Sequence, residues 1–457
     1  MQNDLQTSKP REGAASASSR AAGINPKAVS RDIGADMPTK SNWDWETGSR
    51  QITDIRQWQN QFNWVEEPCV SPNGEKLAAI VNLAEGEFKV CVNEDTWETA
   101  FDKIWNLKFV PDGRLSALVS EMGEWTVAVD GAAWKNKFGY VWNPMFSPDG
   151  KNIAVAVQQD MTYCMALNDV PWEETFPNLT NPTLSPDGKK TAAAVQVVEF
   201  GEGEIHKFQK GAFAPALDGK IWDTAFVNVW KLAISSDGRQ VAAEVRLNLY
   251  DYTVAVNGRP WEQTFDCVWE PVFHPQNGAV VAPVRSGGKW FLAQDGRILW
   301  DRKFVQLWHP MFSPGGEKLA AVVSPKYGKW TVAVDGKPWP ITFGDLVTDA
   351  VFSPDGNRLA AVAKHDGKWL IVLDGALWKH TFDMAWRPVF SPGGSEVAVK
   401  IQRNGKYGVV VNDRLWDQEC DTIWDPVFST EGDKLLLRTL QDGMYTRRVI
   451  SVKEILR

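Results

Sequence analysis

Short runs of hydrophobic residues, separated by turn-forming residues, recur along most of the chain with a period of about forty residues. In the period that spans residues 310–343, the runs are Pro310–Ser313, Lys318–Val323, Trp330–Val334 and Trp339–Phe343. The second run is apolar at almost every position, which predicts a strand that is covered on both faces. A helical period is sustained nowhere, so each period predicts four short β-strands.

Each period carries the same turn between its first and second runs, with the sequence Ser-Pro-Asp-Gly or a variant of it. Proline presets the backbone of the second turn residue, aspartate bonds to nearby N–H groups, and glycine accepts a positive φ. The ten turns are Ser71–Gly74, Val110–Gly113, Ser147–Gly150, Ser185–Gly188, Ser235–Gly238, His274–Gly278, Ser313–Gly316, Ser353–Gly356, Ser391–Gly394 and Ser429–Gly432. Their closing glycines are 37 to 40 residues apart, except for one gap of 50 residues. The sequence therefore predicts ten tandem repeats.

A tryptophan stands thirteen or fourteen residues before every one of these turns. The set consists of Trp58, Trp97, Trp134, Trp172, Trp222, Trp261, Trp300, Trp339, Trp378 and Trp416. Phenylalanine follows four residues later in every repeat except the last, where Cys420 takes its place. The chain has 24 tryptophans, and further sets precede the first run or begin the third, as Trp308 and Trp330 do. Because so large a residue recurs in every repeat, we interpret these tryptophans as packing residues.

Four-stranded antiparallel sheets repeated radially are the blades of a β-propeller, and this all-β fold is our prediction. We expect ten blades in one ring; two five-bladed propellers are the alternative. The last repeat ends after three runs, whereas Trp58–Phe62 precedes the first complete repeat as a run on its own. We therefore predict that Trp58–Phe62 closes the ring as the fourth strand of the last blade. Residues 1–42 are rich in Ser, Ala, Lys and Arg, which predicts a disordered tail before a propeller of residues 43–457.

Composition and motif content argue against several classes of function. With 49 basic and 57 acidic residues, a net charge of −8, the chain does not suit a nucleic-acid-binding protein. Its five histidines and five cysteines lack the spacing of metal ligands, and no hydrolase, P-loop or dinucleotide motif occurs. We expect no catalytic residue, no cofactor and no metal, and we expect reduced cysteines in a cytoplasmic protein. No export signal and no apolar run of 18 residues is present, so we expect no membrane span.

One repeat is longer than the others, because residues 196–215 add about eleven residues to its period. The added segment carries four large apolar residues: Phe200, Ile205, Phe208 and Phe213. An insertion into a repeat array often lies on a binding face. We predict that these four residues contact a protein partner; the alternative is a long hairpin that packs on itself.

The Ser-Pro-Asp-Gly turns resemble the repeats of TolB-like and WD40-like propellers over residues 58–457. A narrower resemblance rests on residues 41–50 and on the sequence Trp-Thr-Val-Ala-Val-Asp-Gly at Trp125–Gly131 and Trp330–Gly336. These segments resemble the tryptophan-rich D subunits of the Tmc transmembrane redox complexes of sulfate-reducing bacteria. The resemblance implies a cofactor-free subunit on the cytoplasmic side. Its partners would be a multihaem cytochrome c, a membrane cytochrome b subunit and an iron–sulfur subunit related to heterodisulfide reductase.

Two classes of function follow from these observations. The first is a non-catalytic scaffold or assembly subunit of a membrane-associated electron-transfer complex, attached peripherally to the inner membrane through its partners. The second is a free-standing propeller that binds a peptide, a glycan or a small ligand in its channel. The fold alone does not distinguish them.

Overall fold

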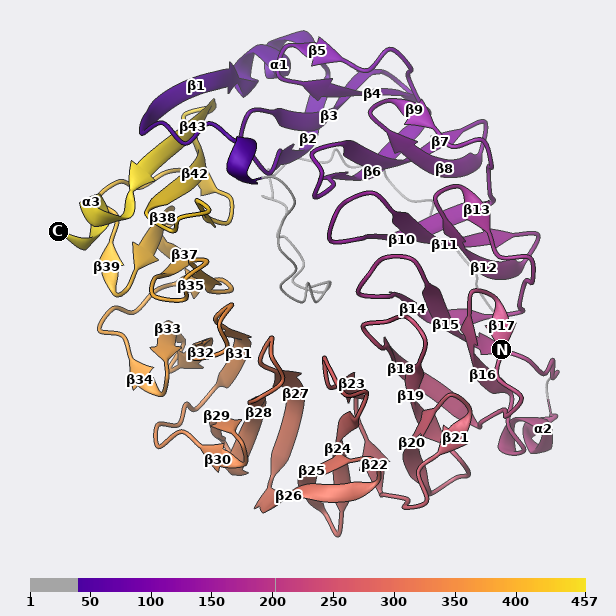
Figure 1. Cartoon of the computed structure of the whole chain (residues 1–457). Coiled ribbons are helices and arrows are strands. Elements are labelled where there is room, and N and C mark those ends of the chain that lie inside the picture. Colours follow the sequence, from indigo (N-terminus) through magenta and orange to yellow (C-terminus); the bar gives the residue numbers. More distant parts are fainter. Residues whose placement is uncertain (1–39, 202) are drawn as a thin grey trace, which may run out of the picture. The chain divides into compact units, whose positions relative to one another are not determined.

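The computed structural model describes residues 40–201 and 203–457, which belong to one compact unit. Ten antiparallel sheets follow one another around a ring, with the first strand of each sheet nearest the centre (Figure 1). The structure thus confirms a single ten-bladed propeller, and the alternative of two five-bladed propellers is wrong.

The blades are numbered here in chain order. Blades 1 and 2 contain β2 (Trp64–Val70), β3 (Leu77–Ala84), β4 (Glu87–Val92) and β5 (Asp95–Thr96), then β6 (Lys103–Phe109), β7 (Leu115–Glu121), β8 (Glu124–Val129) and β9 (Ala132–Ala133). Blades 3 and 4 contain β10 (Tyr140–Phe146), β11 (Ile153–Gln159), β12 (Thr162–Leu167) and β13 (Val170–Pro171), then β14 (Leu179–Leu184), β15 (Thr191–Gln196), β16 (Phe213–Leu217) and β17 (Lys220–Ile221). Blade 5 contains β18 (Asn228–Ile234), β19 (Val241–Arg246), β20 (Tyr252–Val256) and β21 (Arg259–Pro260).

In three of the remaining blades the first strand is split into two short strands. Blade 6 contains β22 (Cys267–Val268), β23 (Val272–Phe273), β24 (Val280–Ser286), β25 (Lys289–Gln294) and β26 (Arg297–Phe304). Blades 7 and 8 contain β27 (Gln306–Phe312), β28 (Leu319–Lys326), β29 (Lys329–Val334) and β30 (Lys337–Pro338), then β31 (Leu346–Phe352), β32 (Leu359–His365), β33 (Lys368–Leu373) and β34 (Ala376–Leu377). Blade 9 contains β35 (Met384–Ala385), β36 (Val389–Phe390), β37 (Val397–Arg403), β38 (Lys406–Val411) and β39 (Arg414–Leu415). Blade 10 contains β40 (Thr422–Ile423), β41 (Val427–Phe428), β42 (Lys434–Gln441), β43 (Met444–Ser451) and β1 (Gly48–Asp54).

The outermost strand of most blades is shorter than the sequence predicts. In blade 7 it is β30, and after it the N–H of Trp339 donates to the carbonyl of Val332. The next pairing joins Phe343 to Trp330. Between these two contacts the third strand covers two residues, from Val332 to Trp330, while the outer segment covers four, from Trp339 to Phe343. For this reason only the two ends of Trp339–Phe343 are hydrogen-bonded to the third strand, and the segment is not a continuous strand.

The ring is closed by an N-terminal strand, but this strand is not the predicted segment. β1 pairs antiparallel with β43 of blade 10. Trp58–Phe62 instead belongs to the helix α1 (Ile55–Gln61) and its end, and both aromatic side chains are buried in one cluster with Tyr445. A spacing of four residues puts two side chains on one face of a helix as well as on one face of a strand, so the pattern does not distinguish the two. Asp54 caps the helix by accepting a hydrogen bond from the N–H of Arg56.

Buried polar side chains of blade 10 also join it to the turn Ser71–Gly74 of blade 1. Tyr445 and Arg447 each donate to a carbonyl of this turn at 2.9 Å. Arg438 donates through Nη1 to the first carbonyl of the turn at 3.2 Å, and through Nη2 to the carbonyl of Asp425 at 2.5 Å. All three donor side chains are buried. Hydrogen bonds therefore hold the junction between the two ends of the ring in addition to β1.

The recurrent tryptophans lock neighbouring blades together. Six of the ten indoles lie against the glycine in the last hairpin of the following blade, where a Cβ atom would lie 3.1–3.8 Å from the tryptophan side chain. The pairs with this contact are Trp97–Gly131, Trp172–Gly219, Trp222–Gly258, Trp261–Gly296, Trp300–Gly336 and Trp339–Gly375. These glycines have a positive φ, as an Asx-Gly hairpin requires. The contact gives the tryptophans the packing role that the sequence predicts.

Gly375→Ala should destabilise the protein more than Gly405→Ala. Both glycines follow an Asx residue in a hairpin and have φ +78°, so the backbone strain of an alanine, about 1 kcal/mol, is the same at both. A Cβ atom at Gly405 meets nothing within 4 Å, whereas one at Gly375 presses on the indole of Trp339. We expect Gly375→Ala to cost about 1–2 kcal/mol more in chemical denaturation. Equal losses would contradict the locking role of the tryptophan.

Side-chain hydrogen bonds close the Ser-Pro-Asp-Gly turns. The hydroxyl of Ser353 donates to Oδ1 of Asp355 at 2.5 Å and accepts a hydrogen bond from the N–H of Arg358 at 3.0 Å. The bond from Ser353, together with those from Asn357, lowers the pKa of Asp355 to about 2. In blade 6 His274 replaces the serine, and its Nδ1 accepts a hydrogen bond from the second residue after it at 3.1 Å. The loop keeps its length, because the N–H of His274 donates to the carbonyl of Ala279 as in the other turns, although its glycine comes one residue later.

The predicted tail, residues 1–42, lies outside the described residues except for Lys40–Asn42. These three residues form the 3-10 turn η1. The indole N–H of Trp45 donates to the carbonyl of Lys40 at 2.9 Å, and Lys434 of blade 10 donates to the carbonyl of Trp45 at 3.0 Å. The segment before β1 is thus tied to the ring from Lys40 onward.

Candidate functional site

The insertion in blade 4 brings its four predicted contact residues into one cluster. It lies between β15 and β16, contains α2 (Ile205–Gln209), and projects from the outer edge of the ring (Figure 1). The ring centroids of Phe200 and Phe213 lie 6.0 and 6.5 Å from that of Phe208. Ile205 is exposed beside them, and an open pocket of ≈ 310 Å³ lies between Phe200, Ile205 and Phe208. The insertion packs partly on itself and also offers an apolar surface; partner binding there stays a prediction.

A second group of exposed apolar residues lies at the hairpins between the second and third strands, which project from one face of the ring. Its members are Leu83, Met122, Met161, Leu249, Tyr250 and Tyr327. Met122 and Met161 are 89% and 82% exposed and have φ angles of +54° and +63°. This backbone suits asparagine and glycine, and the corresponding hairpins of blades 9 and 10 contain Asn404-Gly405 and Asp442-Gly443. Two bulky apolar side chains therefore occupy unfavourable turn positions in contact with water.

The inner strands bring aromatic residues to the same face. Trp64 and Tyr140 are the first residues of their strands, pair with residues next to the hairpins, and are exposed. Trp105 is exposed between them, with its ring centroid 6.1 Å from that of Tyr140. We name the exposed large apolar residues on this face of blades 1 to 3 the apolar arc, which consists of Trp64, Leu83, Trp105, Met122, Tyr140 and Met161. This surface was not predicted from the sequence.

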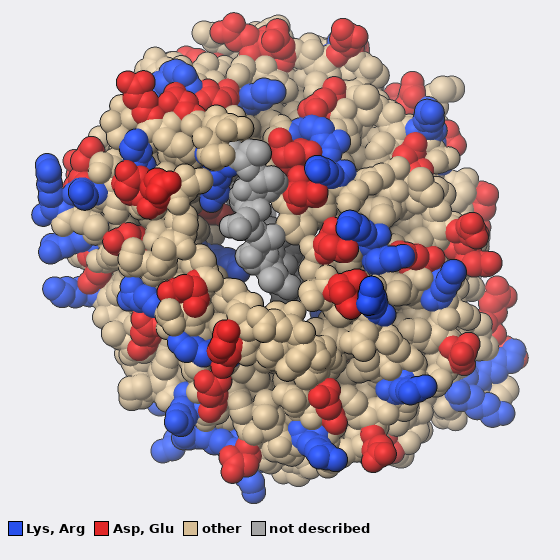
Figure 2. Space-filling view, viewed as in Figure 1, with Lys and Arg blue, Asp and Glu red and all other residues tan. Residues whose placement is uncertain are grey.

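The inner strand of each blade, which lines the central opening, has a bulge or a break. Figure 2 shows acidic and basic residues interspersed around this opening. In blade 7 the register shifts between Trp308 and Met311, so the first strand begins earlier than predicted and includes Trp308. The residue at the bulge is polar in all ten blades: Glu67, Asn106, Asn143, Asn181, Lys231, Glu270, His309, Asp349, Arg387 and Asp425. Some of them bridge blades, since the N–H of Leu107 donates to the carboxylate of Glu67 at 3.1 Å. The inner wall is therefore polar and charged.

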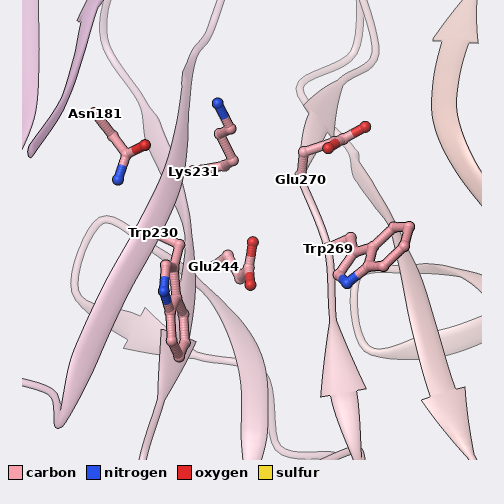
Figure 3. A pocket seen from close by; sticks show the side chains of 6 residues that line it. All are labelled: Asn181, Trp230, Lys231, Glu244, Trp269 and Glu270. Carbon is pink, nitrogen blue, oxygen red and sulfur yellow. The ribbon is translucent and has the colours of Figure 1, made fainter.

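Three successive blades form a recess of ≈ 300 Å³ in this wall. It is lined by Asn181 of blade 4, by Trp230, Lys231 and Glu244 of blade 5, and by Trp269 and Glu270 of blade 6. Figure 3 shows the carboxyl group of Glu244 between the two indole side chains. Burial, and after it the charge of Glu270, raises the pKa of Glu244 to about 8, while Lys231 opposes this shift. The sequence analysis did not single out any of these residues.

Metal-binding groups, membrane-spanning helices and reactive thiols are the other features of residues 40–201 and 203–457 that bear on function. These residues contain no group of three or more side chains that could hold a metal ion, and none of their helices is both long and apolar enough to cross a membrane. The cysteines Cys69, Cys91, Cys164, Cys267 and Cys420 are all free. Burial raises the pKa of Cys164 and Cys420 to about 11, which makes their thiols weak nucleophiles at neutral pH.

The sequence matches no protein-family model and no curated protein. A crystal structure of a eukaryotic initiation factor is similar, with 15% identity, a TM-score of 0.45, and coverage of 69% of this chain and 87% of that chain. The Dos1 propeller has 13% identity, a TM-score of 0.35, and coverage of 79% and 94%. The propeller domain of Cps50 (Swd1) from Myceliophteria thermophila has 12% identity, a TM-score of 0.29, and coverage of 60% and 99%. These likenesses concern the fold, and the resemblance to Tmc D subunits stays a prediction.

Proposed function

We propose that this propeller is a non-catalytic assembly subunit that binds protein partners through the apolar arc. The observation that carries the proposal is the position of Met122 and Met161 at exposed, left-handed turn residues. A left-handed backbone costs an ordinary residue about 1–2 kcal/mol. Exposure provides no hydrophobic stabilisation to offset that cost. Such local strain is typical of functional sites, and flexible methionine side chains suit contacts with another protein.

The extent of the apolar arc favours a macromolecular partner over a small ligand. Trp105, Trp125, Tyr140 and Trp142 form a chain of ring contacts across blades 2 and 3, with centroid distances of 5.8–6.1 Å. Aromatic residues and methionine are enriched at the centres of protein interfaces. The rigid blades beneath would hold these side chains in place, so little conformational entropy would be lost on binding.

The partners that we propose are subunits of a Tmc-type membrane redox complex. They are the iron–sulfur subunit related to heterodisulfide reductase, the cytochrome b subunit and the multihaem cytochrome c. The sequence resemblance at residues 41–50 and in the tryptophan-rich repeats supports this choice. The protein would then lie on the cytoplasmic side of the inner membrane, attached through these partners. The cluster of Phe200, Ile205, Phe208 and Phe213 would provide a second contact at the outer edge of the ring.

Replacing both methionines by the residues that the turns prefer, Met122→Asn with Met161→Gly, should separate folding from binding. The double variant should be as stable as the wild type or more stable by about 1 kcal/mol, because the backbone strain is relieved. Affinity purification of the tagged protein from detergent-extracted native membranes should nevertheless recover about tenfold less of the redox subunits. Val170→Asn is the matched control, since Val170 is an exposed apolar residue in a hairpin on the opposite face.

Full recovery of the redox subunits with the double variant would contradict docking through the apolar arc. Recovery of the wild-type protein without any partner would favour the alternative, a free-standing propeller that binds a ligand. Shortening residues 200–213 to the length of the other repeats tests the second contact separately, because this change leaves the apolar arc intact.

A further inference from the structure

One position of the second strand differs in charge among the blades. In each blade this position pairs with the residue just before the bulge or break of the inner strand, as Ala156 pairs with Trp142 in blade 3. Its residue is apolar in seven blades, as Ile80, Leu118, Ala156, Ala194, Pro283, Val322 and Val362. In the other three blades it is charged, as Glu244, Lys400 and Arg438. Because a buried charge is costly without compensating contacts, each of these three residues calls for a partner.

The two cations among these three residues find partners within the chain, and Glu244 has the backbone and the ammonium group of Lys231 near it. The ammonium group of Lys400 lies 4.5 Å from the ring centroid of Trp386 and 5.4 Å from that of Tyr407. The guanidinium group of Arg438 donates to backbone carbonyls of blades 1 and 10. Blade 9 therefore shows that this place in the repeat accommodates a cation against the tryptophan of the inner strand.

Blade 5 carries the opposite charge in the same place. The tryptophan of the inner strand is kept as Trp230, whereas the cation is replaced by the carboxyl group of Glu244. Trp269 of blade 6 provides a second indole on the other side of this carboxyl group, and Glu270 adds a second acidic side chain (Figure 3). The aromatic surroundings of a cation are thus present, together with two acidic groups.

We propose that this recess binds an organic cation, a guanidinium or ammonium group at the end of an alkyl chain. Glu244 and Glu270 provide the counter-charges, and the indoles of Trp230 and Trp269 contact the cation and its alkyl chain. Lys231 offsets one of the two negative charges, and the Glu270 carboxylate also accepts a hydrogen bond from the N–H of His309 and lies 3.2 Å from its Nδ1. With Glu244 ionised and His309 neutral, the recess therefore matches a single positive charge. The proposal does not depend on partner docking, because the apolar arc belongs to blades 1 to 3.

Binding of the cation should be coupled to the ionisation of Glu244. Burial and Glu270 raise its pKa to about 8, and Lys231 opposes the shift. Cys267, which also interacts with Glu244, has a raised thiol pKa and stays neutral in this range. A bound cation favours the carboxylate over the protonated acid. Binding therefore releases a proton near neutral pH, and the affinity rises as the pH approaches and passes 8.

Isothermal titration calorimetry of the purified protein with n-butylguanidinium tests the proposal, with n-butylurea as the uncharged control. We expect the affinity for n-butylguanidinium to rise about tenfold from about pH 6.5 to about pH 8.5. Glu244→Gln should weaken binding about tenfold at the higher pH and remove most of the pH dependence. Asp349→Asn is the matched control, because Asp349 is a partly buried carboxyl group of the inner wall whose pKa is also raised by burial.

A second titration with an acetylated Gly-Arg-Gly amide distinguishes the two sources of such a cation. Tighter binding than that of n-butylguanidinium would indicate a protein side chain, and equal binding would indicate a small molecule. The proposal would be overturned by an equal response to n-butylurea, by an equal loss with Asp349→Asn, or by unchanged binding with Glu244→Gln. The absence of binding by both cationic probes would overturn it as well, and none of these results would affect docking at the apolar arc.

Discussion

A chain that begins at Arg56 is expected to unfold at least about 10 °C below a chain that begins at Trp43, because it lacks β1. β1 and β43 are joined at six residue pairs, and each hydrogen bond of such a ladder contributes about 0.5–1.5 kcal/mol. Loss of β1 also leaves β43 as an unpaired edge, which favours opening of the ring and aggregation. Differential scanning calorimetry of the two chains measures the difference.

The reference chain that begins at Trp43 makes the result depend on residues 43–55 alone. Both chains retain Trp58–Phe62, which the sequence analysis identified as the closing strand. If that segment closed the ring, the two chains would melt at the same temperature. Equal melting temperatures would therefore contradict closure by β1.

The second large effect is expected for Arg438→Ala, which should lower the free energy of unfolding by about 3 kcal/mol or more. The Arg438 guanidinium group is buried and donates to carbonyls of Ser71 in blade 1 and Asp425 in blade 10. Its removal takes the Arg438 donor away from the carbonyl of Asp425, leaves the carbonyl of Ser71 with the N–H of Gly74 alone, and creates a cavity between the first and last blades. Urea denaturation followed by tryptophan fluorescence measures the loss.

Arg403→Ala is the control for this substitution. Arg403 lies on β37 and pairs with Glu419 at 2.9 Å, but each side chain of this ion pair is 44% exposed to solvent. Exposed ion pairs contribute little to stability, so this variant should unfold close to the wild type. A similar loss for both arginines would show that the junction of the ring does not depend on Arg438.

Most of the fold could be predicted because each structural signal is repeated ten times. A single Ser-Pro-Asp-Gly turn or a single Trp339 says little about the architecture. Their recurrence at nearly constant spacing fixes the number of blades and the order of strands within a blade. The unequal ends of the repeat array also indicate that the N-terminal region completes the last blade.

The closing strand itself could not be recognised, because its sequence lacks a hydrophobic alternation. In Gly48–Asp54 only Thr53 is buried, and the first four residues are exposed, as in a surface loop. Trp58–Phe62 has the stronger hydrophobic signal, but its two aromatic residues fit one face of a helix equally well, and in the structure they lie within α1 and at its end. Pairing with β43, almost 400 residues away in sequence, decides the structure of this region.

The candidate sites depend on differences between repeats, which local patterns do not reveal. Met122 in isolation is one residue of a surface turn, and its positive φ becomes evident only in the structure. Glu244 in isolation is a polar residue in an apolar strand. Its role depends on Trp269 of the next blade, which the packing of successive blades brings to the same recess. The insertion could be found from sequence because it changes the length of the repeat.

Hydrogen–deuterium exchange of the free protein and of the complex recovered by affinity purification tests docking through the apolar arc most directly. We predict slower exchange in the complex for the hairpins of blades 1 to 3, residues 82–88, 120–125 and 158–163. The hairpins between the third and fourth strands, on the opposite face, should exchange at the same rate in both samples. Unchanged exchange at the first three hairpins, with protection elsewhere on the ring, would contradict docking at this surface.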